Sequence, residues 1–171
     1  PLFELKKLGV EKLEFKIESL VDTLIRYKEK GSYSGKSERN PEVLIKKILE
    51  ELEIPFVPGD LQRLVVVLDE EKRTMDLIIP NQENPLLIIE SSYVVTTSSG
   101  QGDKAKTEIN IARLIKKYYP KAQFIGFVDG IGWYVRKNDL KRMVGAYDEV
   151  FTFHKEELKR FKRLLTDVFE K

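Results

Sequence analysis

Two acidic residues, Asp76 and Glu90, each lie in a short apolar run of strand-like sequence, and they are the first candidates for chemistry in this chain. Burying a carboxylate among apolar residues costs free energy unless something pairs with its charge. Two carboxylates on consecutive strands can converge on one divalent cation, and hydrolysis of a phosphodiester uses such a cation. The alternative is that one acid ends an exposed strand while the other lies in a turn, with no shared role.

The alternation of side chains along a strand determines which groups share a face. Glu90 and Ser92 face the same side of their strand, whereas Ser91 faces the other. Asp76 comes near the start of the preceding strand, and in an antiparallel pair the start of one strand meets the end of the next. Asp76 and Glu90 can therefore be adjacent. With the carbonyl of Ser91 they supply two or three hard oxygen ligands, a set that Mg²⁺ favours.

A positive charge is also expected near these acids, because the transition state of phosphodiester hydrolysis carries extra negative charge. Lys104 and Lys106 lie at the start of the helix that follows the third strand. They are separated by about 200° around a helix. We therefore expect Lys104 to point towards the strand ends and Lys106 to face elsewhere.

The elements that must position these groups alternate in type along the chain. Apolar spacing predicts a first helix over about residues 11–29 and a second over residues 41–52, where Asn40 suits the cap and Pro41 the first helical position. Further helices are expected over residues 104–119, 139–147 and 158–168, and strands over residues 61–68, 74–79, 85–95, 124–128, 133–135 and 149–153. Three consecutive strands, followed by a helix that crosses to a fourth, predict an α/β fold with a mixed β-sheet flanked by helices.

The composition is that of a globular protein with a heavily charged surface, since 42% of the 171 residues are hydrophobic and 34% are charged. A chain of this length is most simply one domain. Within it we expect N-terminal helices over residues 11–52, a catalytic core over residues 61–128 and a C-terminal extension over residues 131–171. The formal net charge of +2 does not by itself indicate nucleic-acid binding, so a DNA-binding protein of this composition needs its basic groups sorted onto one face.

Several classes of site are excluded or disfavoured. The chain has no cysteine, which excludes disulfides, thiol catalysis and zinc held by cysteine. Its single histidine, His154, argues against a Ser-His-Asp triad, and we expect it in a turn or helix cap. No glycine-rich phosphate-binding loop is present, which argues against a nucleotide cofactor. No stretch is apolar enough for a membrane span and no secretory signal is visible, so no membrane contact and a cytoplasmic location are expected.

The order of these features resembles the PD-(D/E)XK superfamily of nucleases over about residues 42–128. In that pattern an Asp is followed by Glu-x-Lys at the end of the next strand, and then by a helix and a strand. Here Asp76, Glu90 and Ser92 stand at the three positions, so serine replaces the usual lysine. Members of the superfamily with Glu, Gln, Asn or Ser at this position are known. We expect Lys104 to substitute for the missing lysine in space.

A closer resemblance is to the type II restriction endonucleases that cut at GATC. Residues 90–93 read Glu-Ser-Ser-Tyr, and residues 100–106 form a glycine-rich segment ending in lysines, similar to the Glu-x-Asn and Gly-rich-Ser-Lys segments of that family. Residues 129–133 read Asp-Gly-Ile-Gly-Trp, similar to its strand ending in Asp-Gly-x-Gly-Trp. Residues 35–42 loosely resemble its Arg-Asn-rich segment and early helical Glu. The chain looks like the nuclease portion of these longer enzymes, and the recognition sequence is not carried over with the resemblance.

This resemblance implies a Mg²⁺-dependent DNA endonuclease, most specifically a type II restriction enzyme that leaves 5′-phosphates. Its catalytic residues would be Asp76, Glu90 and Lys104, and the metal ligands would be Asp76, Glu90 and the Ser91 carbonyl. Cutting both strands of double-stranded DNA generally takes two such sites, so a homodimer is expected.

Other positions keep two interpretations each. Glu42 is first a partner of its helix dipole, and by the resemblance it can also hold a metal-bound water. The small-residue loop before Lys104 is either a flexible connector or a close approach to DNA phosphates. Asp103 is expected to cap its helix and Trp133 to belong to the core. Asp129 is expected to lie in a turn, and a contact with a DNA base is the alternative. The auxiliary candidates are Glu42, Ser92 and Lys106, and the candidate DNA contacts are Ser98, Ser99, Gln101 and Lys106.

Two alternative functions stay open. A junction-resolving or repair nuclease of the same fold would read DNA shape rather than sequence. A catalytically inactive nuclease fold that binds DNA or a protein partner is the other alternative, and Ser92 in place of lysine is the feature that supports it.

Overall fold

The computed structural model describes residues 41–61, 74–94, 100–130 and 132–169. The predicted helix over residues 11–29, nearly all of the predicted strand over residues 61–68, and the candidate DNA contacts Ser98 and Ser99 lie outside the described residues.

The described strands form one five-stranded mixed sheet in the order β1-β2-β3-β4-β5. The first three strands are antiparallel neighbours, and β3, β4 and β5 run parallel to one another. The strands are β1 (Val57–Asp60), β2 (Thr74–Ile79), β3 (Leu87–Tyr93), β4 (Gln123–Asp129) and β5 (Glu149–Phe151). The predicted mixed α/β sheet is confirmed.

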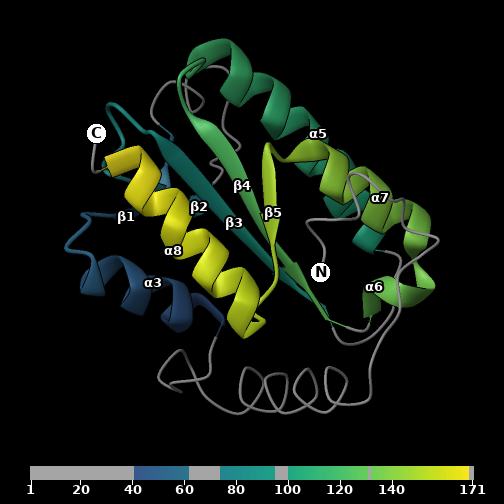
Figure 1. Cartoon of the computed structure of the whole chain (residues 1–171). Coiled ribbons are helices and arrows are strands. Elements are labelled where there is room, and N and C mark those ends of the chain that lie inside the picture. Colours follow the sequence, from purple (N-terminus) through teal and green to yellow (C-terminus); the bar gives the residue numbers. More distant parts are fainter. Residues whose placement is uncertain (1–40, 62–73, 95–99, 131, 170–171) are drawn as a thin grey trace.

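Helices cover both faces of this sheet (Figure 1). One face packs against α5, α6 and α7 through a core that includes Ile111, Trp133 and Met143. The other packs against α3 and α8 through Ile45, Leu49 and Phe161. The described helices are α3 (Pro41–Glu51), α5 (Gly100–Tyr118), α6 (Gly132–Val135), α7 (Lys137–Ala146) and α8 (Lys155–Phe169).

β3 is the central strand of the arrangement, and every one of its residues is buried. Its apolar residues alternate between the two cores, with Ile88 facing the α5 side and Leu87 and Ile89 facing the α3 and α8 side. A strand that packs on both faces needs apolar residues at nearly every position, which is what this segment has. The acid within it, Glu90, is therefore enclosed by the same packing.

Two predicted elements differ from the structure at their starts. α5 begins at Gly100 rather than at Lys104, so Asp103 lies inside the first turn of the helix and the prediction that it caps the helix is wrong. β1 spans Val57–Asp60, a segment before the predicted strand over residues 61–68 for which the sequence analysis predicted no strand.

The predicted strand over residues 133–135 is also wrong, because these residues belong to the short helix α6. The chain turns sharply after β4, where Gly130 has a φ of +109°. The N–H of Gly132 then donates to the carbonyl of Val94 at 3.0 Å. Trp133 reaches the core from this helix, so the apolar residue is buried without a strand.

No helix in the described part of the chain is both long and apolar enough to cross a membrane. His154 immediately precedes α8, and its carbonyl accepts a hydrogen bond from the N–H of Leu158 at 2.9 Å. This position at the helix start agrees with the expected cap or turn role.

Candidate active site

The two acids come from neighbouring strands and lie across from each other. The ladder between β2 and β3 pairs Leu77 with Ile89, and one further step in this register places Asp76 opposite Glu90. Beyond the ladder, the N–H of Ser91 donates to Asp76 Oδ2 at 2.7 Å. The carboxylate of Asp76 thus binds the backbone of the strand that carries Glu90. The structure brings these two residues together.

Both acids face the side of the sheet that α5 covers. Ile78 and Ile88 belong to the core beneath α5, and residues two positions along a strand share a face, which places Asp76 and Glu90 on that side as well. Glu90 is only 6% exposed, whereas Asp76 is half-buried. Charges in so enclosed a setting interact more strongly than charges in water.

A lysine from α5 reaches the same place. Lys104 is half-buried, and its Nζ donates to the carbonyl of Ser91 at 3.4 Å. Lys106 is exposed, and its Nζ lies 3.5 Å from Asp103 Oδ1 on the same helix. The structure therefore separates the two lysines as helix geometry requires, with Lys104 at the strand end.

Ser92 occupies the position of the usual lysine and is 1% exposed. It shares the face of Glu90, and its carbonyl accepts a hydrogen bond from Trp133 Nε1 at 3.5 Å. A hydroxymethyl group cannot carry charge, and a long side chain would have to displace packed neighbours here. The positive charge near the acids comes from α5 instead.

The donor atoms at this place suit a hard divalent cation. Asp76 and Glu90 offer carboxylate oxygens and Ser91 a carbonyl oxygen, all of which Mg²⁺ accepts. In the described part of the chain, no group of three or more His, Cys, Asp or Glu side chains is placed to hold a metal ion, and this site is no exception. Two carboxylates with a backbone oxygen would leave the other positions of an octahedron to water and phosphate. Because Lys104 already donates to the Ser91 carbonyl, the two carboxylates are the stronger candidates as ligands.

The end of β3 is bound to the neighbouring strand by a set of contacts that we name the β3–β4 corner, formed by Ser92, Val94, Asp129, Gly130 and Trp133. The N–H of Val94 donates to the carbonyl of Asp129 at 2.9 Å. The Asp129 carboxylate accepts two further backbone hydrogen bonds. Trp133 is 1% exposed, which confirms that it belongs to the core. The sequence analysis expected Asp129 in a turn, with a DNA-base contact as the alternative, and did not find these contacts.

The remaining candidates lie apart from the acids or are enclosed. Glu42 lies near the start of α3, on the opposite face of the sheet. Gln101 is 4% exposed, which leaves little of its side chain for a direct DNA contact, while Lys106 is exposed. Glu108, which sequence reasoning missed, is fully buried one helical turn after Lys104. The sequence feature that could have revealed Glu108 is the presence of an acid within the apolar stripe of α5.

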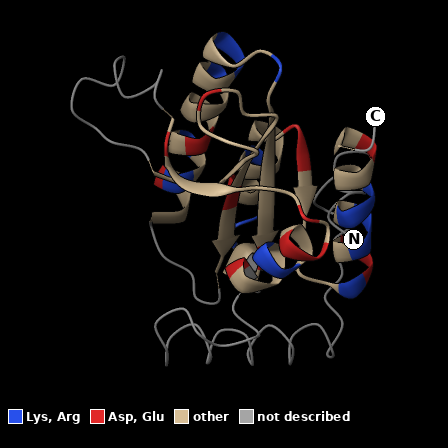
Figure 2. Ribbon diagram, turned by 90° about the vertical axis from the view of Figure 1, so that its left-hand side faces the viewer, with Lys and Arg blue, Asp and Glu red and all other residues tan. Residues whose placement is uncertain are grey.

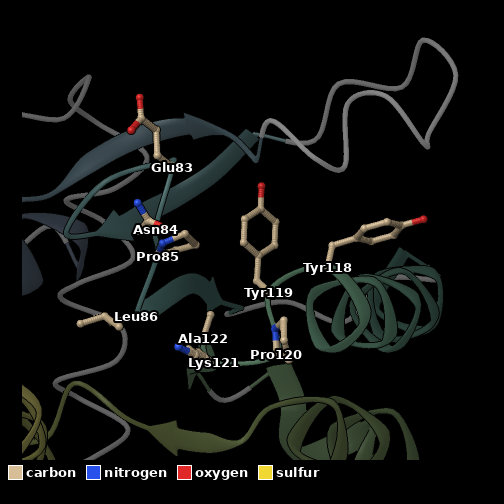
Figure 3. A pocket seen from close by; sticks show the side chains of 9 residues that line it. All are labelled: Glu83, Asn84, Pro85, Leu86, Tyr118, Tyr119, Pro120, Lys121 and Ala122. Atoms are coloured by element: carbon tan, nitrogen blue, oxygen red, sulfur yellow. The ribbon is translucent and has the colours of Figure 1, made fainter.

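Two pockets lie at the other end of the sheet. One, of about 290 Å³, is lined by the turn before β3 and the end of α5, including Leu86, Tyr119 and Lys121 (Figure 3). The other, of about 570 Å³, lies between α5, the start of β4 and residues 145–148. Neither pocket is lined by Asp76, Glu90 or Lys104, so neither coincides with the two acids.

The helix α8 carries both basic and acidic residues (Figure 2), and three of its five basic residues pair with acids. Lys159 pairs with Glu156, and Lys162 pairs with Glu51 of α3. Arg160 pairs with Glu149 and Glu157. Such pairs are typical of a solvated helix surface and contribute little to stability.

Comparison with known families decides the class of the protein. The family model described as DpnII restriction endonuclease matches residues 15–162, which include both acids, Lys104 and the β3–β4 corner. The chain belongs to the DpnII restriction endonuclease family. The resemblance to this family of restriction endonucleases is thereby confirmed, and DNA is its substrate. Searches of curated proteins and of solved structures gave no match.

Proposed function

We propose that this member of the DpnII family is a Mg²⁺-dependent type II restriction endonuclease with a PD-(D/E)XK active site formed by Asp76, Glu90 and Lys104. It hydrolyses both strands of double-stranded DNA and leaves 5′-phosphates. The observation that carries the proposal is the convergence at Ser91, whose N–H binds Asp76 and whose carbonyl binds Lys104. Glu90, the residue before Ser91, is the third of the proposed active-site residues.

Asp76 and Glu90 would hold the divalent cation, with the Ser91 carbonyl beside them. When bound, such a cation supplies Lewis acidity to the phosphodiester and to an attacking water. The hydrogen bond from Ser91 fixes the Asp76 carboxylate against β3 and leaves its second oxygen for a ligand. The packing on both faces of β3 holds Glu90 in the same way, so the two carboxylates need little reorganisation.

Lys104 supplies the positive charge that Ser92 cannot. Its ammonium lies at the end of β3 and is half-buried, where its interaction with a phosphate oxygen is less screened than at the surface. In this position it stabilises the negative charge that develops on the phosphate and orients the attacking water. The replacement of lysine on the strand by a lysine on the helix keeps the chemistry while changing the residue that delivers it.

Cleavage of both strands generally takes two copies of the site, so the active species is proposed to be a homodimer in the cytoplasm. The function is tested by incubating the protein with plasmid DNA and Mg²⁺. Discrete fragments with 5′-phosphates support a restriction endonuclease. Cleavage confined to branched substrates would favour a junction nuclease instead, and no cleavage of any DNA would refute the proposal.

The acids are tested by Asp76→Asn and Glu90→Gln, each of which should abolish cleavage by removing a metal ligand. The matched control is Glu83→Gln, because Glu83 is an exposed acid in the turn between the same two strands. Circular dichroism should show that all three variants fold. Cleavage by Asp76→Asn or Glu90→Gln at the wild-type rate would show that the active site lies elsewhere.

A further inference from the structure

We propose that Asp129 is a positioning residue of the active site, which holds the end of β3 from the neighbouring strand. The inference rests on the proposed function, because it concerns the same site. Asp129 has no role in the chemistry and acts through Ser91 and Glu90.

Three backbone hydrogen bonds converge on Asp129. Its carbonyl accepts from the N–H of Val94 at 2.9 Å, just beyond the end of β3. Its Oδ1 accepts from the N–H of Gly130 at 2.7 Å, and its Oδ2 accepts from the N–H of Phe153 at 3.0 Å. β4 lies between β3 and β5 (Figure 1), and Phe153 follows β5. Asp129 therefore joins the ends of both neighbouring strands.

The end of β3 is also the part of the sheet that carries the site. Tyr93 pairs with Asp129 and Ser91 pairs with Phe127 in the parallel ladder between β3 and β4. Ser91 lies three residues before Val94, which is about 10 Å along a strand. A shift of this strand end would move the two groups of Ser91 that bind Asp76 and Lys104, and the hydrogen bond from Trp133 to Ser92 is a second restraint on it.

The local sequence supports a close approach at this point. Gly130 has a φ of +109°, and a Cβ on it would overlap the carbonyl of Val94. Glycine therefore allows the chain after β4 to pass directly against the end of β3. The turn that follows Asp129 therefore packs directly against Val94, the residue that follows β3.

A carboxylate suits this role because it accepts two hydrogen bonds with two oxygens. An asparagine has nearly the same shape but only one oxygen, and its amide group would face the N–H of either Gly130 or Phe153. Asp129→Asn therefore removes one backbone contact with a small change in volume. The chain also offers a matched control at the other end of β4, where Asp148 Oδ2 accepts from the N–H of Phe124 at 2.8 Å.

The test compares the 171-residue chain with its Asp129→Asn and Asp148→Asn variants. Single-turnover cleavage of plasmid DNA in Mg²⁺ gives the rate constant of the chemical step, and titration of the same DNA in Ca²⁺ gives its affinity. Amide hydrogen exchange, followed by NMR, reports Ser91 and Val94 independently of catalysis. Urea unfolding shows whether the two variants lose similar stability.

We expect Asp129→Asn to lower the cleavage rate constant on the order of 100-fold, with DNA affinity within about twofold of wild type, because misplacing a catalytic group affects the transition state most. Exchange at Ser91 and Val94 should rise by about tenfold or more. Asp148→Asn should keep the wild-type rate constant and the wild-type exchange of Ser91 and Val94, whatever loss of stability the urea unfolding measures.

Equal effects of the two variants on cleavage would overturn the proposal, because they would show that Asp129 contributes only to stability. Unchanged exchange at Ser91 in Asp129→Asn would overturn it as well. If the wild-type protein cleaves no DNA, the proposed function fails, and the exchange measurement still decides whether Asp129 holds the end of β3.

Discussion

Replacing Lys104 with alanine tests the feature that sets this site apart from a Glu-x-Lys strand. The Nζ of Lys104 lies 3.4 Å from the carbonyl of Ser91, next to Glu90 in the chain. For a phosphate oxygen bound beside the acids we take a separation of about 5 Å from this ammonium, since opposite charges affect each other strongly within about 4–6 Å. At an effective dielectric constant of about 20, two unit charges at this separation interact with about 3 kcal/mol.

A loss of about 3 kcal/mol from the transition state corresponds to roughly two orders of magnitude in rate. We therefore expect Lys104→Ala to lower the single-turnover cleavage rate constant by roughly 100-fold at saturating Mg²⁺. Binding of Mn²⁺, measured by calorimetry, should be largely retained because the carboxylates are unchanged. The assay uses linear duplex DNA in excess enzyme, so that product release does not contribute.

Lys106→Ala is the matched control, because it removes the same charge from the same helix. Its side chain is 65% exposed and pairs with Asp103 rather than with the strand end. Exposed charges of this kind are screened by salt, so we expect weaker DNA binding and a cleavage rate constant within about twofold of wild type. The reasoning is refuted if Lys106→Ala slows the chemical step more than Lys104→Ala does.

Two further predictions concern the metal and the packing beside the site. Cleavage should require Mg²⁺ or Mn²⁺ and should fail in Ca²⁺, because Ca²⁺ tolerates looser coordination and supports DNA binding better than hydrolysis. Full activity in EDTA would exclude the metal mechanism. Gly126→Ala should destabilise the protein by about 1–3 kcal/mol, because the added Cβ would overlap the ring of Tyr147; an unchanged urea midpoint would contradict that packing.

The central strands of the fold could be predicted because their apolar sequence pattern is compatible with one type of secondary structure. The strand over residues 74–79 has the predicted bounds, since apolar residues occupy its length and a polar turn follows it. The continuous apolar run before Glu90 predicted a strand covered on both faces, and every residue of β3 is buried. Local patterns were sufficient here because burial on both faces leaves little choice of structure.

The segment after β4 could not be predicted in the same way. Trp133 and its neighbours have side chains typical of a strand, yet they form α6. The deciding contact joins Gly132 to Val94, which is distant in sequence. Tertiary contacts override local preference at such corners, because the backbone hydrogen bonds find partners on another strand.

The candidate site shows the same division between local and long-range information. The separation of Lys104 from Lys106 follows from helix geometry and was expected from their spacing. The role of Asp129 was not visible, because its carboxylate binds the N–H of Phe153, which is 24 residues away. Hydrogen bonds between residues so distant depend on the assembled sheet, and a single sequence gives no signal for them.

The position of a bound metal tests the central claim most directly. A crystal of the protein grown with Mn²⁺ should show an anomalous difference peak whose distances to a carboxylate oxygen of Asp76 and of Glu90 are both about 2.0–2.6 Å. The same peak should disappear in Asp76→Asn and persist in Glu83→Gln. A peak at another group of residues, or a site that binds Mn²⁺ equally well after both acids are neutralised, would contradict the assignment of this active site.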